Sequence, residues 1–182
     1  HHLCAMCAAM GGKNLVHGSP KQRLIQNGQT HQEAIQLATQ FFSKAAECAE
    51  KFGLTYCIEP LSLDQTPIIN TIAQAIAVIH EINHPALKTM LDTSSAGLTE
   101  SASIANLIDQ YFPSGHLAHV QLNDPNRKGP GQGDMQFGDI LQALKRNGYQ
   151  GTIAIEPFDY QPDGPACAAH SIGYLKGLCE IH

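Results

Sequence analysis

Two short apolar runs that each end in Glu-Pro constrain the fold of this chain more than any other feature. Residues 56–60 read Tyr-Cys-Ile-Glu-Pro, and residues 153–157 read Ile-Ala-Ile-Glu-Pro. Proline has no N–H to donate to a sheet ladder, so each strand must stop there, with Glu59 or Glu156 at its end. In folds built from repeated β/α units, that end of the strands carries the active site.

Two further apolar runs between these glutamates also end in oxygen-bearing side chains. One run ends at Asp92 and the other contains Gln121. The intervals from Glu59 to Asp92, from Asp92 to Gln121 and from Gln121 to Glu156 are 33, 29 and 35 residues. A strand, a helix and their loops need roughly 30 residues, so the spacing predicts successive parallel β/α units. We expect the four side chains to converge at one edge of the sheet.

Helical patterns separate the strands. The longest begins at a capping box formed by Thr30 and Glu33, continues with apolar residues three and four apart, and ends before Gly53. The alternation of strands and helices predicts a parallel sheet with helices outside it. The expected strands are 14–18, the run up to 59, 87–92, 117–122 and 151–156; the expected helices are 3–10, 30–52, 70–82, 100–111, 139–147 and 171–181.

Polar side chains at successive strand ends favour a barrel over an open sheet, because an open sheet usually concentrates its ligand contacts at one switch point. We therefore predict part of a (β/α)8 TIM barrel, a partial barrel of five C-terminal β/α units in a single domain over residues 1–182. Five units cannot close an eight-stranded barrel. Either the first three units are absent from this sequence, or another chain covers the open edges, as in a homo-oligomer.

Composition argues against two classes of partner. The net charge is −5 with only 11 Lys and Arg, which leaves no basic stripe for a nucleic acid backbone. No apolar run reaches the roughly 18 residues of a membrane span, and no signal peptide is visible. The six cysteines fall inside apolar patterns, as expected of reduced thiols. We expect a cytoplasmic protein that binds neither nucleic acid nor membrane.

The strand-end side chains suggest a metal site. Glu59, Asp92, Gln121 and Glu156 offer only carboxylate or amide oxygens, which suit Mn²⁺, Mg²⁺ or a similar divalent cation. Three ionised carboxylates without a cation would repel one another and raise at least one pKa. Any one of them alone could be a solvated strand-end residue. Together, at matching strand ends, they indicate a shared cation.

The order of these motifs resembles the xylose isomerase-like TIM-barrel superfamily of sugar phosphate isomerases and epimerases. The resemblance implies that Glu59, Asp92, Gln121 and Glu156 hold a divalent metal ion. It also implies that Glu59 and Glu156 are the catalytic acid and base. Many members have histidine where this chain has Gln121, whereas the hydroxypyruvate isomerase branch has glutamine. The motifs are 58–61, 91–93, 119–121, 126–134 and 155–158.

The same resemblance implies two substrate-binding residues. Arg127 matches an arginine that contacts substrate oxygens, and its planar guanidinium suits a carboxylate, a phosphate or vicinal hydroxyls. His17, at the end of the first strand, falls where related barrels place a pocket histidine. Two positions depart from the epimerase pattern: Ser95 replaces a histidine and Gln65 replaces a glutamate. These departures weaken a ketose 3-epimerase assignment more than they weaken the metal site.

The implied function is that of a metal-dependent isomerase or epimerase acting on a sugar, a sugar phosphate or a hydroxy-keto acid. One of Glu59 and Glu156 would remove a proton beside the carbonyl, giving an enediolate, and the other would return one. A metal-dependent dehydratase on the same barrel and a non-catalytic partial-barrel binding protein are the alternatives. The endonuclease IV branch needs histidine ligands where this chain has Ser95 and Gln121.

Overall fold

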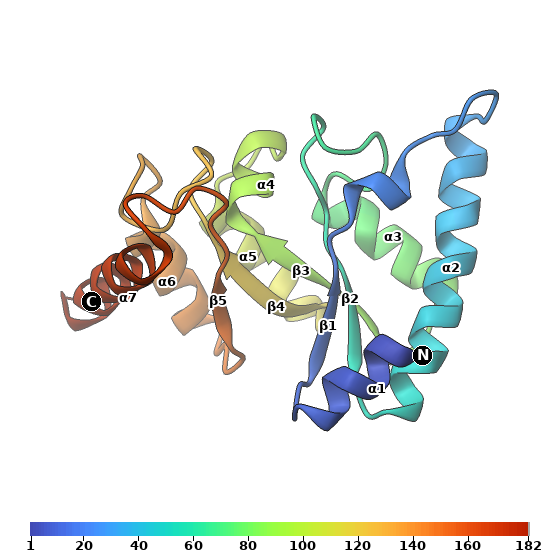
Figure 1. Ribbon diagram of the computed structural model, residues 1–182, viewed down its shortest axis with the longest axis horizontal. Coiled ribbons are helices and arrows are strands. Elements are labelled where there is room, and N and C mark those ends of the chain that lie inside the picture. The colour runs from blue at the N-terminus through green and yellow to red at the C-terminus, as the bar shows by residue number, and fades with distance from the viewer. Residues whose placement is uncertain (182) are drawn as a thin grey trace. The chain divides into compact units, whose positions relative to one another are not determined.

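The computed structural model describes residues 1–181 and contains one sheet of five strands in chain order (Figure 1). The first two strands pair in parallel with His17 opposite Ile58, and the last two pair in parallel with Leu122 opposite Ile155. The expected partial barrel of five β/α units is therefore confirmed as a parallel half-barrel. The strands are β1 Asn14–His17, β2 Thr55–Ile58, β3 Leu87–Asp92, β4 Leu117–Leu122 and β5 Ile153–Ile155.

Helices follow every strand, and two of them differ from the sequence prediction. An unpredicted helix occupies Thr93–Thr99, where small polar residues have weak helix propensity but Asp92 caps the first turn. The last helix begins at Gly164 rather than at 171, because Asp163 accepts a hydrogen bond from the Ala166 N–H. The helices are α1 His2–Ala9, α2 His31–Lys51, α3 Ile72–Ile82, α4 Thr93–Thr99, α5 Ile104–Tyr111, α6 Phe137–Arg146 and α7 Gly164–Ile181, with 3-10 turns η1 Pro20–Arg23 and η2 Phe112–Ser114.

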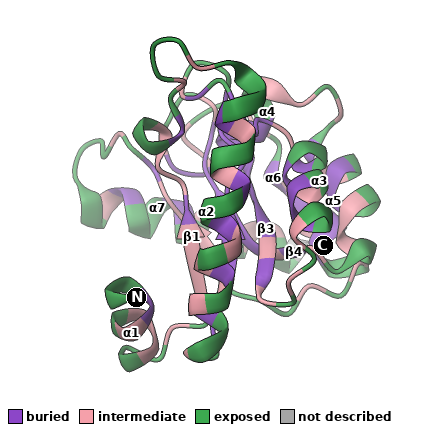
Figure 2. Ribbon diagram, turned by 90° about the vertical axis from the view of Figure 1, so that its right-hand side faces the viewer, coloured by how far each residue is buried: buried purple, intermediate pink, exposed green. Residues whose placement is uncertain are grey.

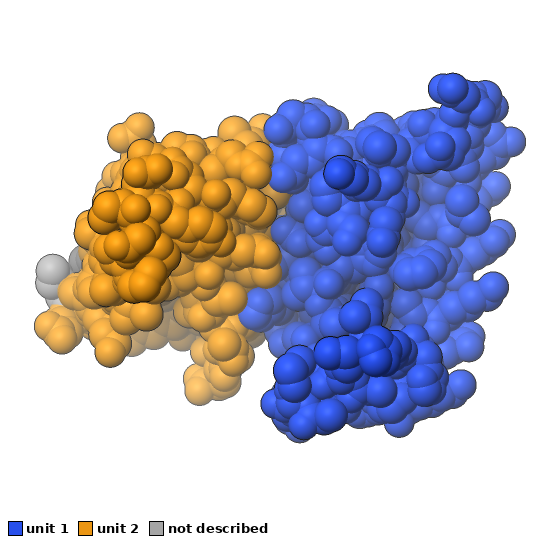
Figure 3. All heavy atoms as spheres, viewed as in Figure 1, with its two compact units in different colours: residues 1–91, 116–119 blue, residues 92–115, 120–182 orange. Residues whose placement is uncertain are grey.

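The chain divides into two compact units, coloured blue and orange in Figure 3. The first contains His1–Leu91 with His116–His119, and the second contains Asp92–Gly115 with the chain from Val120 onward. Each unit has its own buried apolar residues. Those of the first include Phe42, Ile58, Ile79 and Leu87, and those of the second include Leu107, Ile108, Phe137 and Leu144.

Helix α2 shows how the amphipathic pattern is used. The predicted capping box is present: the Glu33 N–H donates to Thr30 Oγ1 at 3.2 Å, and the Thr30 N–H donates to Glu33 Oε2 at 2.7 Å. One face of the helix is buried and the other is exposed, as the colours of Figure 2 show. Phe42 lies on the buried face, 1% exposed, while its neighbour Phe41 is 50% exposed.

No helix within residues 1–181 combines the length and the apolar character that a bilayer span requires. Helix α2 has 21 residues, but Lys44 and Glu47 lie on its exposed face.

The six cysteines are all free thiols, as their apolar surroundings in the sequence predicted.

The two neighbouring phenylalanines of α2 provide a matched test of this core. Replacing Phe42 with alanine should lower the free energy of unfolding by about 3–5 kcal/mol, because it leaves a cavity in the first unit. Phe41→Ala should cost less than about 1 kcal/mol, since half of that side chain is already in water. Urea unfolding of both variants measures the difference. Equal losses would contradict the assignment of the buried face.

Candidate metal centre

Asp92 is the last residue of β3 and also the N-cap of α4. Its Oδ1 accepts a hydrogen bond from the Ser95 N–H at 2.7 Å, and its Oδ2 accepts one from Asn123 Nδ2 at 2.6 Å. The side chain is buried. An ionised carboxylate has about four acceptor positions, so these two bonds leave lone pairs for a cation. Asp92 is thus held in one orientation before any ligand arrives.

Asn123, the residue after β4, joins two of the predicted site residues. Its Nδ2 donates to Asp92, and its Oδ1 accepts the backbone N–H of Glu156 at 2.6 Å. Its own backbone N–H donates to Thr93 Oγ1 at 2.8 Å, and that hydroxyl donates to the Asn123 carbonyl at 2.7 Å. The side chain is fully buried. No role was predicted for Asn123 from the sequence, although its position directly after a strand is a signal there.

Electrostatics in this cluster favours a cation. Burial raises the pKa of Glu156, and the nearby charge of Asp92 raises it further. Burial also raises the pKa of Asp92, against the hydrogen bonds from Ser95 and Asn123 that lower it. Burial thus destabilises the ionised form of both carboxyl groups, and a nearby positive charge would stabilise it.

Gln121, on β4, supplies the observation that tests whether a metal ion fits. Its side chain is buried, and its Oε1 has no hydrogen-bond partner among the described residues. A buried amide oxygen without a partner is costly unless a ligand completes it. A hard divalent cation accepts such an oxygen together with carboxylates. Asp92 and Glu156 lie in the same unit as Gln121 and offer carboxylate oxygens.

Glu59 follows β2 in the first unit and lies against the turn after β1. Its backbone N–H donates to the His17 carbonyl at 3.3 Å, and its side chain is buried. A Cβ on Gly18 would collide with the Glu59 carboxylate. Glycine at position 18 is therefore what leaves room for this carboxylate.

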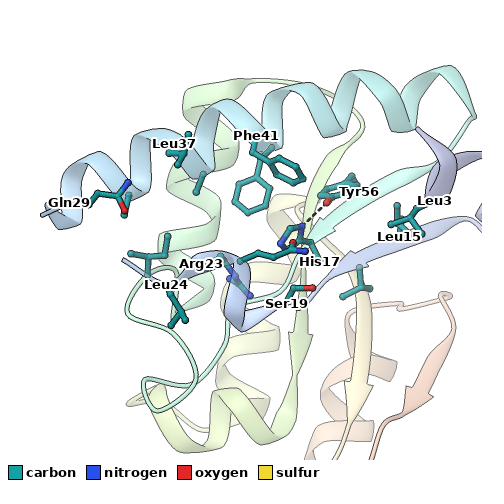
Figure 4. A pocket seen from close by; sticks show the side chains of 16 residues that line it. Leu3, Leu15, His17, Ser19, Arg23, Leu24, Gln29, Leu37, Phe41 and Tyr56 are labelled. Carbon is teal, nitrogen blue, oxygen red and sulfur yellow. Dashed lines mark hydrogen bonds between the residues drawn. The ribbon is translucent and has the colours of Figure 1, made fainter. Parts of the chain in front are cut away.

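His17, the last residue of β1, is buried and lines a cavity of about 650 Å³ (Figure 4). Its Nδ1 lies 2.7 Å from the Tyr56 hydroxyl. Burial lowers the pKa of His17 to about 4, and the charge of Arg23 contributes to this shift. The imidazole is accordingly neutral at neutral pH.

Arg127 lies in the loop after β4 and is exposed. Its guanidinium carbon stands 4.6 Å from the centre of the Phe158 ring, a cation–π contact. Its carbonyl accepts the N–H groups of Phe158 and Asp159, at 2.8 and 3.0 Å. The loop is fixed further by Asp124, whose Oδ2 accepts the Met135 N–H at 3.0 Å. Arg127 is thus anchored beside the segment that follows β5.

Residues 1–178 of the chain match the family model of the xylose isomerase-like TIM barrel. The chain is 32% identical over 115 residues to a D-psicose 3-epimerase of Ruminiclostridium cellulolyticum, covering 63% of this chain and 38% of that protein. It is 28% identical over 147 residues to a putative hydroxypyruvate isomerase of Streptomyces coelicolor, covering 76% of this chain and 50% of that protein.

Among solved structures, a D-psicose 3-epimerase with D-tagatose from Clostridium cellulolyticum H10 superposes with a TM-score of 0.75 at 25% identity. The match covers 86% of this chain and 54% of that one. The chain thus spans about two fifths to one half of the curated relatives it matches. Ketose epimerases and a hydroxypyruvate isomerase are the proteins that it resembles.

The depressed pKa of His17 predicts a loss of stability in acid. Unfolded histidine titrates near 6.5, whereas His17 in the folded chain titrates near 4. The unfolded state binds the proton more readily, so folding should weaken as the pH falls from about 6.5 to about 4. After allowance for solvent screening, we expect up to about 2 kcal/mol from this group.

Urea unfolding at pH 7 and pH 4.5 measures this effect in the wild type and in His17→Gln. The variant should lose less stability between the two pH values than the wild type does. His2→Gln, at an exposed histidine, is the control and should behave as the wild type. An identical pH dependence in His17→Gln and the wild type would contradict the role of His17 burial.

Proposed function

We propose that this chain, which belongs to the xylose isomerase-like TIM-barrel family, forms the metal and proton-transfer site of an isomerase or epimerase. The substrate would be a small sugar, a sugar phosphate or a hydroxy-keto acid. One observation carries the proposal: Asn123 joins Asp92 to the Glu156 backbone, and in the same unit the buried Gln121 Oε1 has no hydrogen-bond partner among the described residues. The names of the relatives, psicose 3-epimerase and hydroxypyruvate isomerase, support the reaction class.

We assign the metal ligands to Glu59, Asp92, Gln121 and Glu156. The assignment is supported by the acidic residues Glu59, Asp92 and Glu156, each of which offers a carboxylate oxygen. These donors favour Mn²⁺, Mg²⁺ or a similar ion. A divalent cation held there would polarise the substrate carbonyl and lower the cost of an enediolate.

The chain's own residues would move the proton. Glu156, whose pKa is raised by burial and by Asp92, is suited to accept a proton from carbon and to return one. Glu59 would serve the opposite face of the same carbon or its neighbour. Neutral His17 and the guanidinium of Arg127 would hold the substrate oxygens. Acid and base catalysis of this kind contributes about 10² to 10⁴ in rate.

The direct test is metal-dependent exchange of a substrate C–H proton with D₂O, followed by NMR. The panel is D-psicose, D-tagatose, L-ribulose and hydroxypyruvate, with Mn²⁺ or Mg²⁺ present. Glu59→Gln and Glu156→Gln should each reduce exchange by about 10²-fold or more, because each removes a proton-transfer group. Glu47→Gln, at an exposed glutamate of α2, is the matched control and should exchange as the wild type.

Two results would contradict the proposal. The first is a folded wild-type protein that binds the metal ion but exchanges no proton with any member of the panel. The second is exchange that survives in Glu156→Gln at the wild-type rate.

Gly18→Ala offers a separate prediction for the metal site. The new methyl group would push the Glu59 carboxylate aside, and a flexible side chain can move at little cost to folding. We expect the metal-free stability to change by less than about 1 kcal/mol. Metal affinity, measured by calorimetry, should fall by about 10- to 100-fold.

Gly173→Ala in α7 is the control for this substitution, since a Cβ at position 173 meets no atom within 4 Å. It should leave both stability and metal affinity close to those of the wild type. Unchanged metal affinity in Gly18→Ala would remove Glu59 from the set of metal ligands.

A further inference from the structure

Arg23 is a buried cation whose side chain makes no hydrogen bond with the described residues. It is the last residue of η1 and only 3% exposed. Its Nε, Nη1 and Nη2 are all buried and have no hydrogen-bond partner among the described residues. A buried charge without hydrogen bonds is among the most costly arrangements in a folded protein. Such a group is expected where a ligand completes it.

A second hydrogen-bond donor without a partner lines the same cavity. His17 Nε2 is also buried and has no hydrogen-bond partner among the described residues. Tyr56, whose pKa burial raises to about 12, keeps its proton and can donate it to His17 Nδ1. His17 then carries its own proton on Nε2. Figure 4 shows Arg23, His17 and Tyr56 together in the cavity wall.

The electrostatics of the cavity suits an anion. Burial lowers the pKa of Arg23 to about 10, with the charge of Glu59 acting in the opposite direction, so Arg23 remains charged at neutral pH. His17 is neutral there and can only donate from Nε2. A guanidinium fork and an imidazole N–H offer donors alone, the complement of a group with several acceptor oxygens.

The rest of the cavity wall is mainly apolar, with Leu15, Phe41, Phe42 and Ile68 among its residues. Such a lining can shelter the carbon atoms of a small ligand. The Arg23 guanidinium is itself buried, and burial strengthens its attraction to an anion.

We propose that Arg23 and His17 form an oxyanion site that binds the carboxylate or phosphate group of a small ligand. The ligand's oxygens would accept hydrogen bonds from the Arg23 guanidinium and from His17 Nε2. If the proposed function holds and this ligand is the substrate, the substrate is an anionic hydroxy-keto acid or sugar phosphate rather than a neutral ketose.

Calorimetric titration with inorganic phosphate and with glycolate, in EDTA so that no metal ion is bound, tests the site. The wild type should bind at least one of the two anions. Arg23→Gln should bind it about 10-fold more weakly or worse, because charge-assisted hydrogen bonds are lost. Arg146→Gln is the control: it removes an exposed arginine that pairs with Asp109, and it should bind as the wild type.

The two probes separate the sources of the anion. Tighter binding of phosphate indicates a sugar phosphate, and tighter binding of glycolate indicates a hydroxy-keto acid; either result supports the site. A wild type that binds neither anion overturns the proposal. So does a variant Arg23→Gln that is folded by circular dichroism and binds as tightly as the wild type.

Because Arg23 is buried, a second measurement replaces Arg23→Gln if that variant does not fold. The arginine side-chain Nε–H spectrum of the wild type, recorded by NMR with and without phosphate or glycolate, then decides. A shifted buried resonance supports the site, and an unchanged spectrum overturns it. Because these measurements use no metal ion and no turnover, their failure is distinguishable from failure of the proposed function, which is absent proton exchange in the wild type or exchange that survives in Glu156→Gln.

Discussion

The side-chain amide of Asn123 is the interaction on which the second unit's site depends. Its Nδ2 binds Asp92 Oδ2, and its Oδ1 binds the N–H of Glu156, both at 2.6 Å. An amide donates and accepts at once, so one buried side chain links the end of β3 to the end of β5. Without it, a buried carboxylate and a backbone N–H would each lose their partner, which costs about 1–3 kcal/mol per group. The cluster is therefore organised before any ligand binds.

Buried charge gives each unit its chemical character. In the second unit, burial raises the pKa of Asp92 and of Glu156, and the charge of Asp92 raises that of Glu156 further, which favours a cation. In the first unit, Arg23 and neutral His17 present donors to a cavity and favour an anion. A hydroxy-keto acid or a sugar phosphate carries both a metal-chelating carbonyl and a separate anionic group.

The sequence predicted the strands well because local signals mark their ends. Proline after Glu59 and after Glu156, and the spacing near 30 residues, predicted four of the parallel strands, and the short apolar run at 14–18 predicted the first. Helix α4 was missed because its stability comes from the Asp92 cap rather than from propensity. Asn123 was missed although it directly follows a strand, because its role depends on hydrogen bonds to residues distant in the sequence. Arg23 was missed because its burial without hydrogen-bond partners is a property of the fold that no local pattern encodes.

The central claim is that Glu59, Asp92, Gln121 and Glu156 share one divalent cation. Anomalous scattering at the manganese edge, from crystals grown with Mn²⁺, tests it most directly. We predict a single strong peak with an oxygen of each of these side chains at about 2.0–2.4 Å. A peak coordinated by other residues, or no ordered ion at saturating Mn²⁺, would contradict the claim.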